Sequence, residues 1–200
     1  MRIAVFDLCG TLYRCNTLFT FTRWICPKNL LRRLGDSYWG YLADELFPQK
    51  QWRRQQHLKS LRDFEKEELC YYGQKFVREI LPPLARPSAL ALLKKLQEDG
   101  WATLLISAAP DFLAEPVAWQ MGFYEWHSSL YQNGKLKRDL TGCKEKILKE
   151  YFPWERLLVC TDNRSDEKLL RYADERVIYT SQRYKDWWLQ RFDPKELREV

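Results

Sequence analysis

The chain has 200 residues, of which 46% are hydrophobic and 15% aromatic, and this composition is typical of a globular protein with a sizeable core. No apolar run approaches the ~20 residues that span a bilayer, and the N-terminus enters an apolar strand pattern directly, without the pattern of a signal peptide. The net charge of +6 is moderate. These features argue against a membrane-spanning or secreted protein and predict a cytoplasmic one.

The cysteines argue against a zinc site. They form no C-x-x-C pair, and the chain has only two histidines, His57 and His127. Zinc sites draw on closely spaced Cys and His ligands, which this pattern lacks. We therefore expect reduced thiols at the six cysteines, which are Cys9, Cys15, Cys26, Cys70, Cys143 and Cys160.

The first predicted element is a buried strand, because residues 3–6 form a continuous apolar run. The strand ends at Asp7, and Gly10 allows a sharp turn after it. In open α/β sheets, ligands bind at the carboxyl ends of the strands. Asp7 is therefore a candidate nucleophile or metal ligand.

A helical insertion is predicted next, because the chain between Asp7 and Ser107 is far longer than one crossover helix requires. It spans roughly residues 14–85. Apolar residues recur at three- and four-residue intervals in it, which predicts amphipathic helices over residues 29–46, 51–61 and 69–80. Pro82-Pro83 ends the last of these helices.

The net charge lies in this insertion. From Arg14 to Arg86 there are 14 Lys or Arg and 8 Asp or Glu, a difference of +6, so the rest of the chain is neutral overall. A basic lid would attract an anionic substrate, although a charge run is also typical of a solvated helix face. The basic residues are accompanied by three tryptophans, Trp24, Trp39 and Trp52. Basic and aromatic residues together also suit binding to a membrane surface or to a single-stranded nucleic acid, which are the weaker alternatives for the partner of this insertion.

The remaining elements alternate between helix and strand. Residues 87–100 read as a helix stopped by Gly100, and an Asn-Gly turn predicts a hairpin at residues 131–136. The alternation predicts a Rossmann-like parallel sheet flanked by helices. In chain order, the other predicted segments are a strand at 103–107, a helix at 111–120, a strand at 157–161, a helix from Asp166 to Tyr172, a strand at 177–179 and an amphipathic tail with Trp187 and Trp188.

Polar residues follow three of these strands in a recognisable order. The segment Val5-Phe6-Asp7-Leu8-Cys9-Gly10-Thr11-Leu12 resembles the first motif of the haloacid dehalogenase-like superfamily, whose phosphatases open with D-x-D-G-T. Ser107, followed by Ala108, resembles the second motif. The pair Asp162 and Asp166 resembles the fourth. The third motif is a lysine, for which Lys146 is preferred because an apolar residue follows it, while Lys144 stays open.

The resemblance implies a phosphate-transfer site with a magnesium ion. Asp7 would be the nucleophile, and Thr11, Ser107, Ala108 and Lys146 would hold the phosphate. The Mg²⁺ ligands would be Asp7, the backbone carbonyl of Cys9 and Asp162, with Asp166 orienting the waters of the ion or holding the lysine. Magnesium takes hard oxygen ligands and keeps several waters, so this donor set suffices.

Cys9 stands where phosphatases of this superfamily carry their second aspartate, which protonates the leaving alcohol and activates the hydrolytic water. Such general acid–base help is worth roughly 100-fold to 10,000-fold in rate. A thiol with a reference pKa of about 8.5 replaces it poorly. Cys9 is equally consistent with a small buried hydrophobic residue.

Other members of the superfamily bear on the substrate. Dehalogenases carry Tyr at the position of Cys9, and phosphonoacetaldehyde hydrolases carry Ala together with a cap lysine. Phosphoserine phosphatases place a Glu where this chain has Asn16, which argues against phosphoserine itself. Arg14, Asn16 and Thr17 are candidate substrate contacts, and a helix-capping role fits them as well. Phosphonate cleavage stays open as an alternative reaction, because four lysines of the insertion could take the place of that cap lysine. They are Lys50, Lys59, Lys66 and Lys75.

The sequence thus predicts a core domain of residues 1–13 and 86–200 with an all-helical cap domain of residues 14–85. The leading hypothesis is a Mg²⁺-dependent phosphatase-type hydrolase that acts on a small phosphorylated metabolite through an aspartyl-phosphate on Asp7. The alternative is a catalytically impaired phosphate-binding or regulatory protein, because of Cys9. A nucleic acid or a peripheral membrane contact is the weakest hypothesis, and the sequence predicts no oligomeric state.

Overall fold

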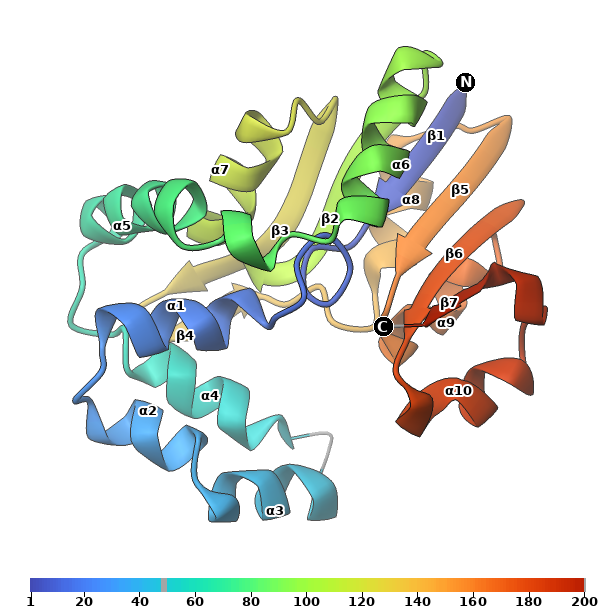
Figure 1. The fold of residues 1–200 in the computed structure, drawn as a ribbon. Coiled ribbons are helices and arrows are strands. Elements are labelled where there is room, and N and C mark those ends of the chain that lie inside the picture. The colour runs from blue at the N-terminus through green and yellow to red at the C-terminus, as the bar shows by residue number, and fades with distance from the viewer. Residues whose placement is uncertain (48–49, 200) are drawn as a thin grey trace.

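The computed structural model describes residues 1–47 and 50–199. Within them the chain forms a seven-stranded sheet in the order β4-β3-β2-β1-β5-β6-β7, with helices on both sides (Figure 1). The predicted Rossmann-like α/β fold is confirmed. Residues 48 and 49 of the expected cap and residue 200 of the expected core lie outside the described residues.

The sheet is parallel except for the hairpin of β3 and β4. The first strand is central, and its Val5 lies opposite Leu104 on β2 and Val159 on β5. The carboxyl ends of these three strands therefore meet at one edge. The strands are β1 (Arg2–Phe6), β2 (Ala102–Pro110), β3 (Glu125–Gln132), β4 (Lys135–Arg138), β5 (Arg156–Thr161), β6 (Glu175–Thr180) and β7 (Leu197–Glu199).

Alternating side chains of β1 build two cores, one on each face of the sheet. Phe6 packs in the cluster that includes Leu113, whereas Val5 packs in the cluster that includes Leu148 and Trp188. A layer of helices covers each face of the sheet, excludes water from the strands and holds the edge of the sheet rigid. The first layer is formed by α6 (Pro87–Glu98) and α7 (Asp111–Gln120), the second by α8 (Lys144–Tyr151), α9 (Glu167–Leu170) and α10 (Gln182–Leu189).

The inserted segment is helical, as predicted, but its first long helix is broken. Residues 29–46 form two helices, because Asp36 ends the first and the Ser37 side chain caps the second by accepting a hydrogen bond from Gly40 N (3.3 Å). The helices are α1 (Thr17–Ile25), α2 (Leu30–Gly35), α3 (Tyr38–Leu46), α4 (Trp52–Lys59) and α5 (Lys66–Glu79).

Two of these helices, α1 and α5, pack on the core as well as on helices of the insertion. The Phe21 ring on α1 lies 5.3 Å from Phe76 on α5 and 5.4 Å from Phe112 on α7, so one aromatic cluster joins all three helices. A Cβ on Gly73 of α5 would lie 2.1 Å from the Phe112 carbonyl oxygen. In contrast, α2 and α3 pack mainly on α4 and on each other. A separate cap domain over residues 14–85 stays a prediction.

The hydrophobic surface is concentrated on α2 and α3. Of the described helices, none is long and apolar enough to cross a membrane. Trp39 is 72% exposed, whereas Trp24 and Trp52 are partly buried. The exposed large hydrophobic residues of this region are Leu30, Leu34, Tyr38, Trp39, Tyr41, Leu46 and Phe47.

The C-terminal segment, predicted as an amphipathic tail with Trp187 and Trp188, contains a helix and an additional strand. Residues 182–189 do form α10, with Trp188 fully buried, but the chain then turns at Pro194–Glu196 and adds β7 to the sheet. The short run Leu197–Glu199 has one apolar residue in three, so its pattern carries no strand signal.

The buried His57 predicts a pH-dependent stability. Its Nδ1 lies 2.6 Å from Thr22 Oγ1, and burial lowers the pKa of His57 to about 4, with Asp36 opposing that shift and Arg23 adding to it. The unfolded chain takes up this proton near pH 6.5, whereas the folded chain does so only near pH 4. The free energy of unfolding should therefore fall as the pH is lowered through this window. Urea titrations of the native chain and His57→Gln should diverge between these pH values. Parallel pH curves would contradict this assignment.

Candidate active site

The acidic and hydroxyl residues predicted at the strand ends lie together at the carboxyl edge of the sheet. Asp7 directly follows β1, Ser107 lies in β2 where the register shifts, and Asp162 follows β5. Asp7 is 4% exposed and accepts a hydrogen bond from Leu8 N on its Oδ1 (2.8 Å), and Ser107 is 1% exposed. The parallel register places these side chains together, as the sequence predicts.

The lysine of the site is Lys144, and the preference for Lys146 is wrong. Lys144 is 1% exposed, and its Nζ lies 2.9 Å from Asp7 Oδ1 and 2.7 Å from Asp166 Oδ2. Lys146 is exposed to solvent. Burial by itself would lower the pKa of Lys144, but the attraction of Asp166 and Asp7 outweighs it, so the pKa is raised. Lys144 therefore stays positively charged beside the candidate nucleophile.

Asp166 holds this lysine from the opposite side. Its Oδ2 accepts from Lys144 and from the Thr161 hydroxyl (2.7 Å), whereas its buried Oδ1 has no hydrogen-bond partner among the described residues. Burial raises the pKa of Asp166, and Lys144 opposes that shift. An unsatisfied buried carboxylate oxygen is costly, so this atom indicates a site for a water or a cation shell.

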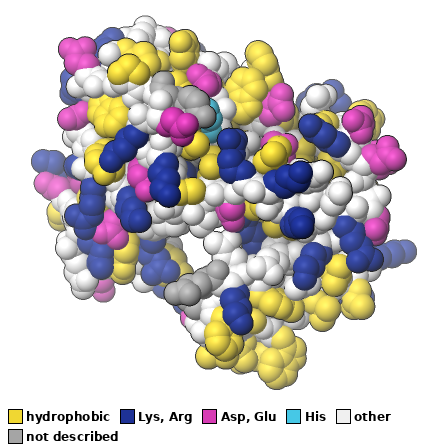
Figure 2. Space-filling view, turned by 180° about the vertical axis from the view of Figure 1, so that it is seen from behind, with side chains coloured by type: hydrophobic (Ala, Val, Ile, Leu, Met, Phe, Trp, Pro, Cys, Tyr) yellow, Lys and Arg dark blue, Asp and Glu magenta, His cyan; other side chains and the backbone are white. Residues whose placement is uncertain are grey.

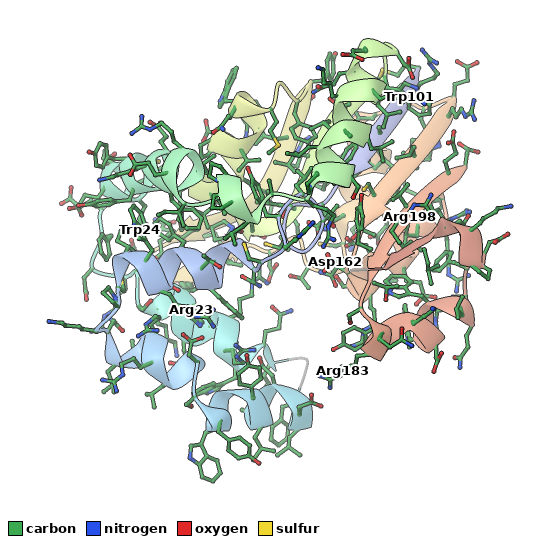
Figure 3. All side chains as sticks on the ribbon, viewed as in Figure 1. Arg23, Trp24, Trp101, Asp162, Arg183 and Arg198 are labelled. Carbon is green, nitrogen blue, oxygen red and sulfur yellow. The ribbon has the colours of Figure 1, made fainter. Side chains whose placement is uncertain are left out.

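Asp162 lies beneath the turn that follows Asp7. Its Oδ1 accepts a hydrogen bond from the Thr11 hydroxyl (3.3 Å). Burial, together with the negative charge of Asp7, raises the pKa of Asp162 to about 7. A nearby cation would relieve that repulsion, since opposite charge favours the ionised carboxyl. In Figure 3, Asp162 lies at the end of the sheet, between the inserted helices and the C-terminal segment, whereas Arg23 and Trp24 lie farther away on α1.

Gly10 makes this close approach possible. Its φ is +72°, and a Cβ there would lie 1.9 Å from Asp162 Oδ2.

Gly142 has a similar φ of +68° but nothing within 4 Å of its Cβ position. Gly142→Ala should therefore lose only the ~1–2 kcal/mol of the left-handed conformation, measured by urea unfolding. Gly10→Ala should lose more and should also displace Asp162. Equal losses in the two variants would contradict this role of Gly10.

Cys9 lies beside Asp7 with its sulfur facing the start of α1. Cys9 Sγ is 3.1 Å from Thr17 Oγ1, and Thr17 N donates to the sulfur at 3.4 Å. Desolvation raises the pKa of the thiol to about 12, and the negative charge of Asp7 adds to that rise. Cys9 is therefore protonated at neutral pH and cannot serve as a base.

A cavity of about 500 Å³ opens over Asp7. Its wall includes Cys9, Ser107 and Ala108 from the strand ends and Asn16 from the start of α1. Asn16 is the N-cap of α1 and accepts from Phe19 N (3.1 Å), which is the capping role considered above. The four insertion lysines considered for phosphonate chemistry do not line this cavity.

Arg54 on α4 is a cavity residue that the sequence analysis treated only as part of a basic surface. Its Nη1 contacts Asp139 Oδ2 (2.8 Å) and Thr141 Oγ1 (2.7 Å), and its Nη2 donates to the Ala108 carbonyl. Arg54 thus joins the insertion to the strand end that carries Ser107. In the sequence, only the adjacent basic residues Arg53 and Arg54 pointed to it.

The residues between Asp162 and Asp166 also line the cavity. Asn163 caps the following turn by accepting from Ser165 N (3.0 Å), and the buried Ser165 Oγ has no hydrogen-bond partner among the described residues. Arg164 lines the cavity from the exposed side of this turn. The sequence analysis did not single out these three residues, although they lie inside its fourth motif.

The donor set fits a magnesium ion, although it is sparse. Within residues 1–47 and 50–199 there is no group of three or more His, Cys, Asp or Glu side chains arranged to hold a metal. Magnesium needs only one or two carboxylates beside waters and a substrate oxygen. Asp7, Asp162 and the Cys9 carbonyl satisfy that requirement, and the unpartnered Asp166 Oδ1 could hold a water of the ion.

A comparison with protein families identifies the family of this chain. The family model of the haloacid dehalogenase-like hydrolases matches residues 4–171, which include Asp7, Ser107, Lys144 and both later aspartates. The chain belongs to the haloacid dehalogenase-like hydrolase family. The predicted family resemblance is thereby confirmed. No curated protein matches the sequence of this chain.

Several solved structures share the fold of this chain at low sequence identity. A protein of unknown function from Bordetella pertussis Tohama I is 16% identical, with a TM-score of 0.77 over 100% of this chain and 97% of that one. A phosphoserine phosphohydrolase-like protein from Francisella tularensis is 16% identical, with a TM-score of 0.61 over 90% and 87% of the chains. A phosphoserine phosphatase, solved as a phospho-aspartyl intermediate analogue, is 15% identical, with a TM-score of 0.62 over 89% and 86%.

Proposed function

We propose that this hydrolase is a Mg²⁺-dependent phosphatase that acts on a small phosphorylated metabolite through an aspartyl-phosphate on Asp7. The observation that carries the proposal is the buried Lys144 ammonium, which lies 2.9 Å from Asp7, a residue that lines the cavity. A phosphate ester repels an anionic nucleophile, so attack by Asp7 requires fixed positive charge beside it. Lys144 supplies that charge without reorganisation, since Asp166 holds it in place.

The residues of the site suggest how the first step would proceed. Leu8 N and Lys144 both contact Asp7 Oδ1, so we assign Oδ2 as the attacking oxygen. Oδ2 would bond to phosphorus as the ester P–O bond breaks and the electron pair leaves with the alcohol oxygen. Ser107 would hold a phosphoryl oxygen from the end of β2. The magnesium ion, held by Asp7, Asp162 and the Cys9 carbonyl, would neutralise charge on the phosphoryl group.

The second step needs a base to activate the water that attacks the aspartyl-phosphate. Cys9 occupies the nearest position on the turn after Asp7, but its thiol is protonated, because desolvation raises its pKa to about 12. This observation favours a second candidate function, in which the phosphorylated protein forms and hydrolyses slowly. Such a protein would act as a phosphate-binding or regulatory protein.

Phosphate release tests the proposal directly. The native chain should release phosphate from members of a panel of phosphomonoesters when Mg²⁺ is present, and EDTA should abolish the release. Asp7→Asn should be inactive, whereas Asp186→Asn, which changes an exposed carboxylate on α10, should behave like the native chain. Release that survives Asp7→Asn would refute the role of Asp7.

Intact mass distinguishes the two candidate functions. A turning-over phosphatase should show little covalent phosphate at steady state, whereas the impaired protein should accumulate one phosphoryl group per chain and release one equivalent of alcohol. That covalent phosphate should be absent from Asp7→Asn. If no member of the panel gives either turnover or a phosphorylated chain, both candidate functions are refuted.

A further inference from the structure

A second cavity lies next to the one over Asp7. Its volume is about 530 Å³, compared with about 500 Å³ for the first. Its floor includes Gly10 and Asp162, and its far side is formed by β6 and the start of α10. Four residues line both cavities, so the two meet along one shared wall, formed by Cys9, Asn16, Asn163 and Arg164.

A buried arginine without an acidic partner lines this second cavity. Arg86 is 4% exposed, and it donates to the carbonyl oxygens of Gly10 (2.8 Å) and Thr11 (3.1 Å). Its guanidinium also lies 4.4 Å from the centre of the Tyr179 ring. No carboxylate of the described residues lies within ion-pair distance of it. A buried cation normally has a counterion, so this site lacks one negative charge.

Two further arginines face the same cavity. Arg14 and Arg164 are exposed, and neither forms an ion pair within the described ranges. The Arg164 guanidinium lies 4.3 Å from the centre of the Tyr184 ring, which orients its donors along the cavity wall. Arg14 is near enough to repel the charge of Arg86, since it contributes to lowering the pKa of Arg86, after burial. Figure 2 shows that Lys and Arg side chains are spread widely over the rear face of the molecule.

These contacts distinguish the second cavity from the first. In the first, Arg54 is already paired with Asp139, so its charge is compensated within the protein. In the second, Arg14 and Arg86 have no ion-pair partner among the described residues, and Asp162 is the single carboxylate that those residues place in the wall. Guanidinium groups are planar forks that match the oxygens of phosphate and carboxylate. The chemistry of this wall therefore fits an oxyanion.

We propose that the second cavity binds a second anionic group of the substrate, a phosphate or a carboxylate, while the scissile phosphate lies over Asp7. The inference rests on the proposed function and narrows its substrate class to phosphomonoesters that carry another anionic group. The substrate would pass along the shared wall, close to Cys9 and Asn163. Arg14 and Arg164 would bind the second group directly, and Arg86 would provide the fixed charge behind it.

Binding to the inactive Asp7→Asn chain tests this inference without requiring turnover. Isothermal titration in Mg²⁺ would compare fructose 6-phosphate with fructose 1,6-bisphosphate, and adenosine 5′-monophosphate with adenosine 3′,5′-bisphosphate. A hydrogen-bonded charge contact is worth about 1.5–3 kcal/mol, so at least one bisphosphate should bind roughly 10-fold or more tightly than its monophosphate. Arg14→Gln should reduce that advantage and leave monophosphate binding unchanged, because Arg14 lines the second cavity and not the first. Arg164→Gln should also reduce that advantage, but it lies on the wall that both cavities share and should weaken monophosphate binding as well.

A matched control and the opposing outcomes complete the test. Arg78→Gln makes the same substitution at an exposed position on α5 outside both cavities, and it should change nothing. Monophosphate binding without any bisphosphate advantage, or an advantage that survives both arginine variants, would overturn this inference alone. A further outcome would also overturn this inference. If inorganic phosphate binds in the second cavity and Arg14→Gln abolishes that binding, but bisphosphates bind no more tightly than monophosphates, the cavity binds a free ion. Failure of every phosphorylated probe to bind would instead refute the proposed function.

Discussion

Cys9→Asp should release phosphate roughly 100-fold to 10,000-fold faster than the native chain, because it introduces the general acid–base group that the site lacks. The Cys9 thiol has a pKa raised to about 12, first by desolvation and then by Asp7, so it cannot take a proton from water near neutral pH. An aspartate in its place would face the Thr17 N–H and hydroxyl, which now lie 3.4 Å and 3.1 Å from the sulfur. Those donors would stabilise the carboxylate.

Steady-state and single-turnover measurements together would check this result. The increase should appear in the hydrolysis of the aspartyl-phosphate, so the covalently phosphorylated fraction seen by intact mass should decrease. Cys143→Asp places the same substitution at a partly exposed cysteine before α8 and should not raise the rate. If Cys9→Asp folds, binds phosphate and is no faster than the native chain, the protein uses another group as its base.

Lys144→Met should destabilise the fold by about 3–5 kcal/mol and abolish phosphate release, because it leaves buried carboxylates without their cation. Lys144 lies between Asp7 and Asp166 with 1% of its surface exposed. Lys146→Met removes the same charge from an exposed position of the same helix and should change the free energy of unfolding by less than about 0.5 kcal/mol. Urea unfolding and phosphate release would be measured for both variants.

A double variant separates stability from activity. Asp166→Asn added to Lys144→Met removes one of the two stranded charges and should recover part of the lost stability, because the two residues are in direct contact. It should recover no activity, since the positive charge beside Asp7 is still missing. Activity at the native level in Lys144→Met would show that another cation serves the reaction.

The sequence predicts most of the site because the site lies at strand ends. Continuous apolar runs predict the strands β1, β2 and β5. Because these strands are parallel and adjacent, Asp7, Ser107 and Asp162 lie at one edge of the sheet, independently of the conformation of the loops. The burial of Arg86 and the second cavity are different. They depend on how β6, α10 and the turn after Asp7 pack in space, and no local pattern in the chain encodes that packing.

The choice between the two lysines shows how a local criterion failed. An apolar neighbour favoured Lys146, but adjacent helical residues point about 100° apart. Lys144 is three residues before Ile147 and four before Leu148, and both of these pack in the core. Helical spacing therefore places Lys144 on the buried face and Lys146 on the solvent face. That signal was available in the sequence.

The broken helix of the insertion has a similar explanation. The apolar periodicity continues across residues 29–46, but Asp36 and Ser37 are strong stop and start residues. Gly40 then lets the two helices cross closely, because a Cβ there would lie 2.6 Å from the Gly35 carbonyl oxygen. Apolar periodicity alone does not show such a turn, because the spacing of the apolar residues continues across it.

The aromatic cluster of Phe21, Phe76 and Phe112 determines where this protein could be recombined with its relatives. A chimera with junctions at residues 14 and 85 would remove both α1 and α5 and leave the Phe112 side of α7 uncovered. Junctions just after α1 and just before α5 would instead exchange α2, α3 and α4 and keep the cluster whole. Arg54 would be exchanged with them. Such an exchange would therefore change the lining of the first cavity, and with it the substrate preference, while the lining of the second cavity stays unchanged.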